Sequence, residues 1–230
     1  MKILFIKIFV AGLIILPGNQ GLAQEGLLAD IIARIEKIDS VSYMISESGA
    51  ITADRPLPEC IAGDPGITVT KVWVKKGYLR REVNSPTANA KKVIQVFTPT
   101  GTHIYNSYSN VTTQYEPSFT GAAGSELGIS RKNADIFKVL GAETIDGKET
   151  TVLEKSFPGD DTVYHSKYWI WNEKGVPLKV ETQWTIMEYL NLQSVQKFTD
   201  YSFEDIPESV FDVANILEIQ SSTITLEKSK

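Results

Sequence analysis

The sequence predicts an α+β fold in which one N-terminal helix and one short internal helix accompany a long antiparallel sheet. Residues 25–40 carry apolar side chains at the spacing of an amphipathic helix. Most of the later sequence alternates between apolar and polar residues, which is the pattern of half-buried strands. Turn signals such as Lys76-Gly77 and Asp146-Gly147 separate these stretches. Strands joined by such tight turns run antiparallel, so we expect a meander of about ten strands.

The N-terminus has the layout of a cleaved secretory signal peptide, residues 1–23. Lys2 and Lys7 accompany a short apolar run, and small residues follow up to Ala23. The run is shorter than the roughly 20 residues of a membrane-spanning helix, which is the competing interpretation. We therefore expect cleavage after Ala23 and export of a mature chain, residues 24–230, that forms a single domain. No cysteine follows the small residues directly, so we expect no lipid anchor.

The first helix has one apolar stripe, formed by Ile31, Ile32, Ile35 and Ile38. Its other side carries charged residues. Because such a stripe is stable only when it is covered, we expect the helix to lie along the sheet and to cover part of its concave face.

A second, short helix is predicted near residue 130. Ser130 is a suitable N-cap and Gly141 stands where a C-cap would be. The residues of this helix that we expect in the core are Ala134, Ile136, Phe137 and Leu140.

The hairpin after residue 162 allows a register to be predicted. A type I turn ending on a left-handed Gly175 gives a three-residue loop that pairs Asn172 with Val176. Counting outward by twos places one apolar set on a single face, while Lys179 lies on the opposite, mixed face. The apolar set is Tyr164, Tyr168, Ile170, Leu178, Val180 and Trp184.

No motif for catalysis or for metal binding is present in the sequence. His103 and His165 stand alone within predicted strands, and residues 159–161 are typical of an acidic turn. No phosphate-binding loop, nucleophile elbow or dinucleotide glycine pattern occurs. We expect no catalytic residues, no metal and no cofactor.

The composition limits the partners and the cross-links. A net charge of −5 argues against a nucleic-acid partner. Cys60 is the only cysteine and cannot form an intramolecular disulfide, so it is a structural residue or, alternatively, a reactive thiol. It lies in a proline-rich stretch, residues 53–66, that predicts a long loop.

Many aromatic residues fall within or beside the predicted strands, Trp73, Tyr168 and Trp184 among them. Ordinary core packing explains such residues in most proteins. The two helices are nevertheless too short to cover a sheet of about ten strands. A curved sheet could therefore leave part of an apolar concave face free to bind a hydrophobic ligand.

Four stretches together resemble the LolA/LolB-like family of periplasmic lipoprotein and lipid carriers, and they span nearly the whole mature chain. They are "ARIEKIDSVSYMI", "KVWVKKGYLRREV", "GAETIDGKETTVLE" with "WNEKGVPLKVE", and "FTDYSFEDIPESVFDV". The resemblance implies an unclosed antiparallel half-barrel, with helices over its open side and an apolar cavity for acyl chains. It also implies that the end of the chain packs back on the barrel through Phe198, Tyr201, Ile206, Pro207 and Phe211.

The resemblance leads to a hypothesis for the cavity. Where the family's lipoprotein chaperone has a lid-closing arginine, this sequence has Lys76, which cannot make the same forked contacts. Lys76 is the expected lid contact. The residues expected to line the cavity are Ile35, Trp73, Tyr168, Ile170, Leu178, Val180 and Trp184.

The function implied is that of a monomeric periplasmic carrier. It would take the acyl chains of a lipoprotein or lipid from a membrane-bound donor and pass them to an outer-membrane acceptor. The alternatives are a sensor that reports on lipoprotein acyl chains and a hydrolase.

Overall fold

The computed structural model describes residues 20–53, 67–85, 91–107, 109–117, 126–158, 162–186, 190–214 and 216. One α-helix, α1 (Gln20–Ile35), precedes the sheet. The strands are β1 (Ser40–Ala53), β2 (Ile67–Lys75), β3 (Tyr78–Ser85), β4 (Lys91–Thr98), β5 (Gly101–Asn106), β6 (Val111–Tyr115), β7 (Phe137–Ile145), β8 (Lys148–Pro158), β9 (Thr162–Trp171), β10 (Pro177–Ile186) and β11 (Leu190–Ser202). Two short 3-10 helices are η1 (Arg131–Ile136) and η2 (Glu208–Phe211).

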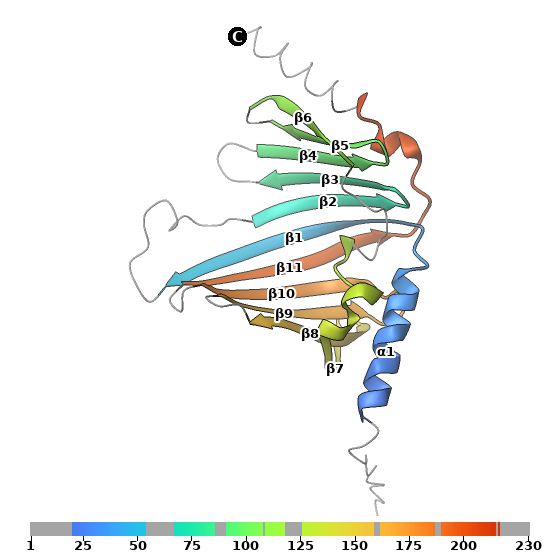
Figure 1. Cartoon of the computed structure of the whole chain (residues 1–230), viewed down its shortest axis with the longest axis vertical. Helices are drawn as coiled ribbons and strands as arrows, with labels where there is room; N and C mark the ends of the chain where they lie inside the picture. Colours follow the sequence, from blue (N-terminus) through green and yellow to red (C-terminus); the bar gives the residue numbers. More distant parts are fainter. Residues whose placement is uncertain are drawn as a thin grey trace, which may run out of the picture.

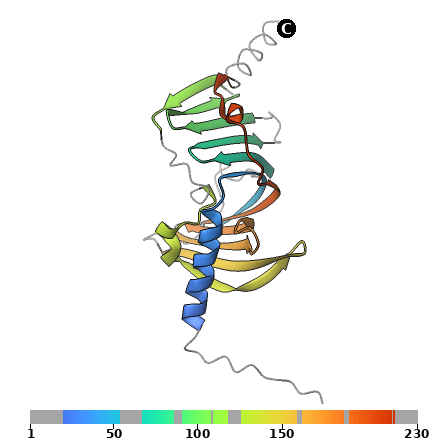
Figure 2. The same ribbon diagram turned by 90° about the vertical axis from the view of Figure 1, so that its right-hand side faces the viewer.

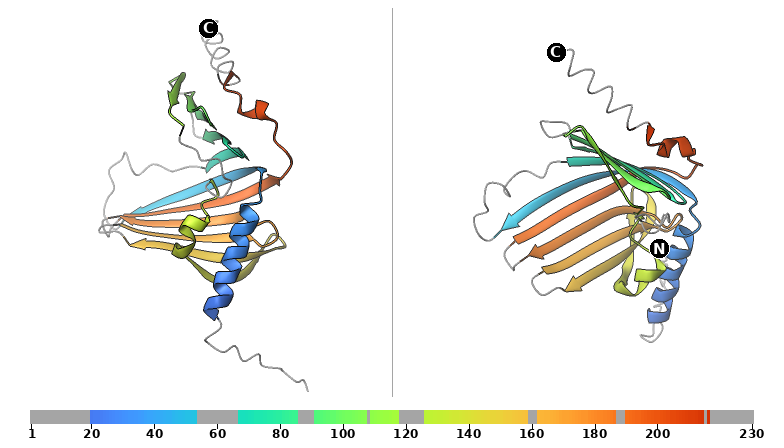
Figure 3. Two further views of the ribbon diagram at one scale, coloured as in Figure 1. Left: turned by 45° about the vertical axis from the view of Figure 1, so that its right-hand side comes forward. Right: turned by 45° about the horizontal axis from the view of Figure 1, so that its top comes forward.

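The strands form a single antiparallel sheet that does not close. Its order is β6-β5-β4-β3-β2-β1-β11-β10-β9-β8-β7, and the two edge strands β6 and β7 are not paired with each other (Figure 1). The sheet is strongly twisted and curved, and α1 lies against its concave side (Figures 2 and 3). This open half-barrel with a covering helix confirms the fold class expected from the sequence.

Three of the four residues of the predicted apolar stripe are buried in α1, and the fourth, Ile38, lies beyond its end and is partly buried. Ile31, Ile32 and Ile35 belong to the main core cluster together with Val41 and Val72 of the concave face. None of the described α1 side chains lines the main cavity, so the helix packs beside that cavity rather than over it.

A glycine lets α1 approach the β9–β10 hairpin closely. A Cβ atom on Gly175, whose φ is +78°, would lie 3.0 Å from Cβ of Arg34 and 3.1 Å from the carbonyl oxygen of Ile31. Both the left-handed backbone and the close helix therefore require glycine at this position.

The prediction for the second helix is wrong in its length and type. Ser130 does precede η1, and its backbone N–H donates to Oδ1 of Asn133 at 2.8 Å. The helix ends at Ile136, however, because Phe137 already begins strand β7 and packs edge-on against Tyr168, with ring centroids 5.4 Å apart. Leu140 is exposed as a result.

Gly141, the predicted C-cap, lies within β7, where the pairing with β8 shifts register between Val139 and Gly141. The backbone freedom of glycine accommodates this irregularity, since its φ is +155°.

The predicted turn of the β9–β10 hairpin is off by one residue, and a bulge compensates for it. The backbone N–H of Trp171 donates to the carbonyl of Val176, which leaves a four-residue loop instead of three. Between Pro177 and Lys179 the register shifts, so Leu178 is an extra residue in β10. Beyond this bulge the pairs are those predicted, such as Val180 with Tyr168 and Trp184 with Tyr164.

The segment after β11 packs on the convex face, as the resemblance implied. Ile206 and Phe211 are buried there against Ile94, Val96 and Tyr105. This second cluster is separate from the concave core, to which Phe198 belongs and against which Tyr201 packs. Pro207 is exposed.

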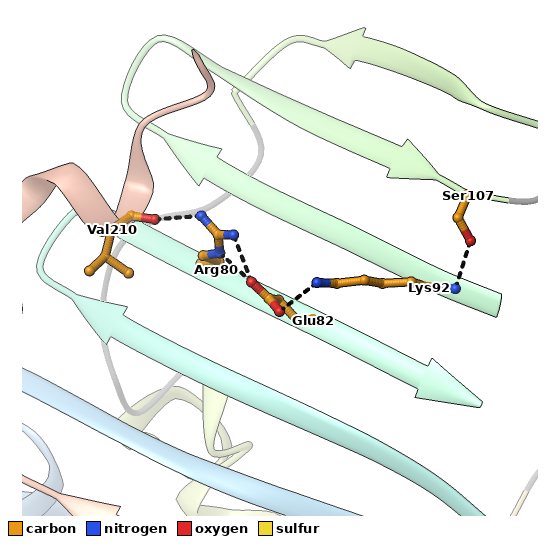
Figure 4. A network of polar contacts seen from close by, with 5 residues as sticks. All are labelled: Arg80, Glu82, Lys92, Ser107 and Val210. Carbon is orange, nitrogen blue, oxygen red and sulfur yellow. Dashed lines mark hydrogen bonds and ion pairs between the residues drawn. The ribbon is translucent and has the colours of Figure 1, made fainter. Parts of the chain in front are cut away.

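A polar network fastens this segment to the sheet (Figure 4). Arg80 donates from Nη1 to the carbonyl of Val210 at 2.8 Å and from Nε to the Glu82 carboxylate at 3.0 Å. Lys92 lies 3.1 Å from the same carboxylate.

Three sequence features lie outside the described residues: Cys60, almost all of the proline-rich loop 53–66, and the acidic turn 159–161. Among the described helices, none is long and apolar enough to cross a membrane.

Candidate functional site

A cavity of about 710 Å³ is the candidate functional site, on the concave face. Strands β1, β2, β3, β4, β9, β10 and β11 contribute its walls, and residues 126–128, here called the cover segment, complete them. Its size falls in the range typical of small-molecule sites, about 300 to 1,000 Å³.

The inner wall of the cavity is apolar and is continuous with the core. Its side chains come from neighbouring strands in register: Val72 pairs with Tyr43, Ile45 with Phe198, and Val180 with Tyr168. Leu127 of the cover segment adds a further apolar side chain.

Tyrosine side chains of this wall are held in the neutral form. Burial raises the pKa of Tyr43 well above its usual range, and the nearby Glu126 carboxylate raises it further, against the opposing charge of Arg81. Burial also raises the pKa of Tyr168. These two tyrosines, which are neutral at pH 7 in any case, therefore stay neutral at alkaline pH as well.

One ion pair joins the sheet to the cover segment. Nε of Arg81 on β3 donates to Oε1 of Glu126 at 2.8 Å, and its Nη2 donates to the other carboxylate oxygen. Both residues line the cavity, and the Glu126 side chain is only 7% exposed. A forked pair of this kind fixes the position of both partners.

The outer part of the cavity is polar. Thr68 and Glu47 are register partners, and Glu47 is also paired with Gln196. Two residues before Gln196 on β11, Ser194 pairs with Thr182. These five side chains, here called the polar band, all line the cavity.

Comparison with known proteins bears on the fold. No protein-family model matches the chain, and no curated protein matches its sequence. An uncharacterised conserved protein from Thermus thermophilus superposes with a TM-score of 0.51 at 11% identity, over 80% of this chain and 91% of that protein. At such identity the comparison shows the fold alone.

Two further solved structures overlap more loosely. A LolA superfamily protein from Nitrosomonas europaea has a TM-score of 0.37 at 14% identity, covering 82% of this chain and 98% of that protein. The lipoprotein LppX of Mycobacterium tuberculosis has a TM-score of 0.43 at 15% identity, covering 79% and 97%. The open half-barrel with a helix on its concave side is the architecture that the sequence resemblance implied. The fold is an open antiparallel half-barrel.

Three of the predicted ligand-binding residues line the cavity of this half-barrel, namely Tyr168, Val180 and Trp184. Ile35 and Ile170 instead lie in the core next to it, with exposures of 1% and 0%.

The other predicted residues lie away from the cavity. Trp73 faces the convex side, where it packs on the second cluster. Its ring centroid lies 5.9 Å from Cζ of Arg80. Leu178 is buried at the bulge of β10 and is not among the lining residues. Lys76 is exposed in the turn between β2 and β3. The charged contact to the cover segment comes from Arg81 instead.

Sequence reasoning missed several lining residues, among them Tyr43, Ile45, Phe198 and the Arg81–Glu126 pair. The alternation of β1 does give Tyr43 and Ile45 one face, so that signal was present. No local pattern links Arg81 to Glu126, which is 45 residues away.

No histidine or cysteine occurs among the described residues that line the cavity. Elsewhere in the described chain, no cluster of three potential metal ligands is present. His165 lies outside the cavity, with Nδ1 2.9 Å from the Ser156 hydroxyl.

Proposed function

We propose that this protein binds the acyl chains of a lipid or lipoprotein in the concave cavity and carries them through the periplasm. The observation that supports this most directly is the apolar inner wall of a cavity of about 710 Å³. Burial of each acyl methylene contributes about 0.8 kcal/mol, which is sufficient to drive loading without a cofactor.

Release would follow transfer to a membrane-bound acceptor whose groove binds the same chains more tightly. The net charge of −5 suits a basic docking face on such a partner. Export by the signal peptide belongs to the same proposal, and intact-mass measurement of the exported protein should give a mature chain that begins at Gln24. Retention of residues 1–23 would contradict this part of the proposal.

The test of acyl binding uses one cavity residue and its neighbour on the opposite face. Ile45 lines the cavity and is only partly buried, so Ile45→Glu should fold but place a carboxylate among acyl methylenes. Met44 precedes it on β1 and points to the convex face, so Met44→Glu is the matched control.

The measurement is the affinity of each purified protein for a fluorescent fatty acyl probe. We expect Ile45→Glu to weaken binding by about a hundredfold or more and Met44→Glu to leave it nearly unchanged. Mass spectrometry of lipid that co-purifies with the wild type provides an independent readout. Equal probe affinity for wild type and both variants would refute the proposal.

A further inference from the structure

We propose that the polar band selects a ligand whose head group is uncharged and rich in hydroxyls, that is, a glycosyl or glycerol lipid. This inference rests on the proposed function, because it assigns the head group of the same acyl ligand.

The polar band is continuous and crosses four strands. The register joins Thr68 on β2 to Glu47 on β1 and then to Gln196 on β11. Ser194 lies two residues before Gln196 on the same face of β11 and pairs with Thr182 on β10. Within the described part of the chain, Thr182 alone among these five side chains has a protein hydrogen-bond partner, the Ser166 hydroxyl at 3.0 Å. The other four side chains are free to contact a ligand.

The band lies between two apolar zones. On its inner side are Ile45, Phe198 and Val180, which belong to the apolar inner wall of the cavity. On its outer side Trp184 pairs with Tyr164 across the strands, with ring centroids 5.8 Å apart. Adjacent rows on one face are two residues, about 6.6 Å, apart along a strand. A ligand seated with its acyl chain inside therefore places its head group on the band and under the rings.

The charges of the cavity argue against an anionic head group. Its described lining contains two carboxylates, Glu47 and Glu126, and a single cation, Arg81, which is already paired with Glu126. A phosphate or carboxylate head group would meet the unpaired Glu47 carboxylate without an unpaired cation to balance it. A quaternary ammonium would balance Glu47, but it neither donates nor accepts hydrogen bonds and would leave the hydroxyls and the carboxamide of the band unpaired.

The hydrogen-bonding groups of the band match a polyol. Hydroxyls and carboxamides both donate and accept, whereas the Glu47 carboxylate only accepts. Vicinal hydroxyls satisfy both kinds of group, while an ester carbonyl can only accept. A purely hydrocarbon ligand would strip water from the band and leave its polar groups unpaired, which is unfavourable. The exposed ring of Trp184 offers a flat apolar surface to the C–H face of a sugar.

The experiment compares ligands with the same twelve-carbon chain below their micelle concentrations, by displacement of a fluorescent acyl probe. The uncharged ligands are dodecyl maltoside and monododecanoylglycerol, and the charged ligands are dodecanoate and dodecyltrimethylammonium. We expect the purified protein to bind the uncharged ligands about tenfold more tightly, the equivalent of one or two net hydrogen bonds. Tighter binding of the maltoside than of the glyceride assigns a sugar, and equal binding of these two assigns any vicinal diol.

Two variants connect this preference to the band. Gln196→Leu and Ser194→Ala should each weaken dodecyl maltoside binding by roughly three- to tenfold and leave dodecanoate binding unchanged. Gln183→Leu, on the opposite face of β10, is the matched control and should change neither affinity. Equal affinity for all four ligands, or tightest binding of a charged one, overturns the head-group inference while acyl binding stands. Binding of none of the four overturns the proposed function as well.

Discussion

The Arg81 guanidinium on β3 and the Glu126 carboxylate of the cover segment form a forked ion pair at the wall of the cavity, with Nε 2.8 Å from Oε1. The Glu126 side chain is almost completely buried, and Arg81 provides the opposite charge beside it. Removing one member of a buried pair is costly because it leaves the other charge unpaired, whereas removing both is often tolerated.

The first prediction concerns this pair. Arg81→Met should lower the free energy of unfolding by about 2 to 4 kcal/mol and speed the release of a bound acyl probe, because Glu126 escapes to water when the cover segment moves. The double variant Arg81→Met, Glu126→Gln should recover much of the lost stability. Urea denaturation and stopped-flow release of the probe measure both effects. Strictly additive effects of the two substitutions would contradict a coupled pair.

The second prediction uses two glycines with similar backbones. Gly175 and Gly147 have φ values of +78° and +75°, but only at Gly175 would a Cβ atom meet neighbouring atoms, those of α1. Gly147→Ala should lower the free energy of unfolding by about 1 kcal/mol, through the strain of a left-handed backbone alone. Gly175→Ala should lower the free energy of unfolding by about 1 to 3 kcal/mol more, since its Cβ atom also pushes α1 away. Equal free energies of unfolding for the two variants would show that α1 is not docked on the hairpin.

The third prediction tests the apolar stripe of α1. Ile35 is 1% exposed and Leu27, on the same helix, is 37% exposed. Ile35→Asp should destabilise the fold by at least about 3 kcal/mol, because it buries a charge without a partner. Leu27→Asp should change stability by less than about 1 kcal/mol. Thermal unfolding of both variants measures the difference, and an unaltered melting temperature for Ile35→Asp would mean that the stripe is not buried.

The fourth prediction is a pH dependence on the convex face. Partial burial raises the pKa of Glu82, but the hydrogen bonds and charges of Arg80 and Lys92 outweigh it and hold the pKa below its usual range. A carboxyl whose pKa is lowered in the folded state stabilises that state above its unfolded pKa, about 4.3, and the contribution is lost as the pH falls through the folded value.

Glu82→Gln should therefore be less stable than the wild type at pH 7, and the difference should shrink at about pH 3. Glu208→Gln is the control, because Glu208 is exposed in η2. Urea denaturation at both pH values measures the effect. A difference between Glu82→Gln and wild type that stays constant with pH would contradict the assigned network.

The sequence by itself determined the elements whose signals are local. The stripe of α1 follows from a period of 3.6 residues, and the turns at Lys76-Gly77 and Asp146-Gly147 follow from the backbone preferences of glycine and aspartate. The alternation of β9 and β10 placed Tyr168 and Val180 on one face. These signals lie within a few residues of the structure that they specify.

Tertiary structure decided which face of each strand meets the cavity. Alternation correctly separates Trp73 from Val72, but it does not say which face is concave. Each face of β2 carries apolar side chains that pack in a core, Val72 and Val74 on the concave side and Trp73 on the convex side, which the segment that carries Phe211 covers. Trp73 therefore belongs to the convex cluster, and Val72 lines the cavity.

Tertiary structure also decided the irregular positions. The bulge at Leu178 and the start of β7 at Phe137 override local helix and turn preferences. Phe137 gains more from packing on Tyr168 than from continuing a short helix, since burial of an aromatic ring exceeds the small differences in helix propensity. The pairing of Arg81 with Glu126 depends on a contact that forms only when distant segments meet, so no local pattern could reveal it.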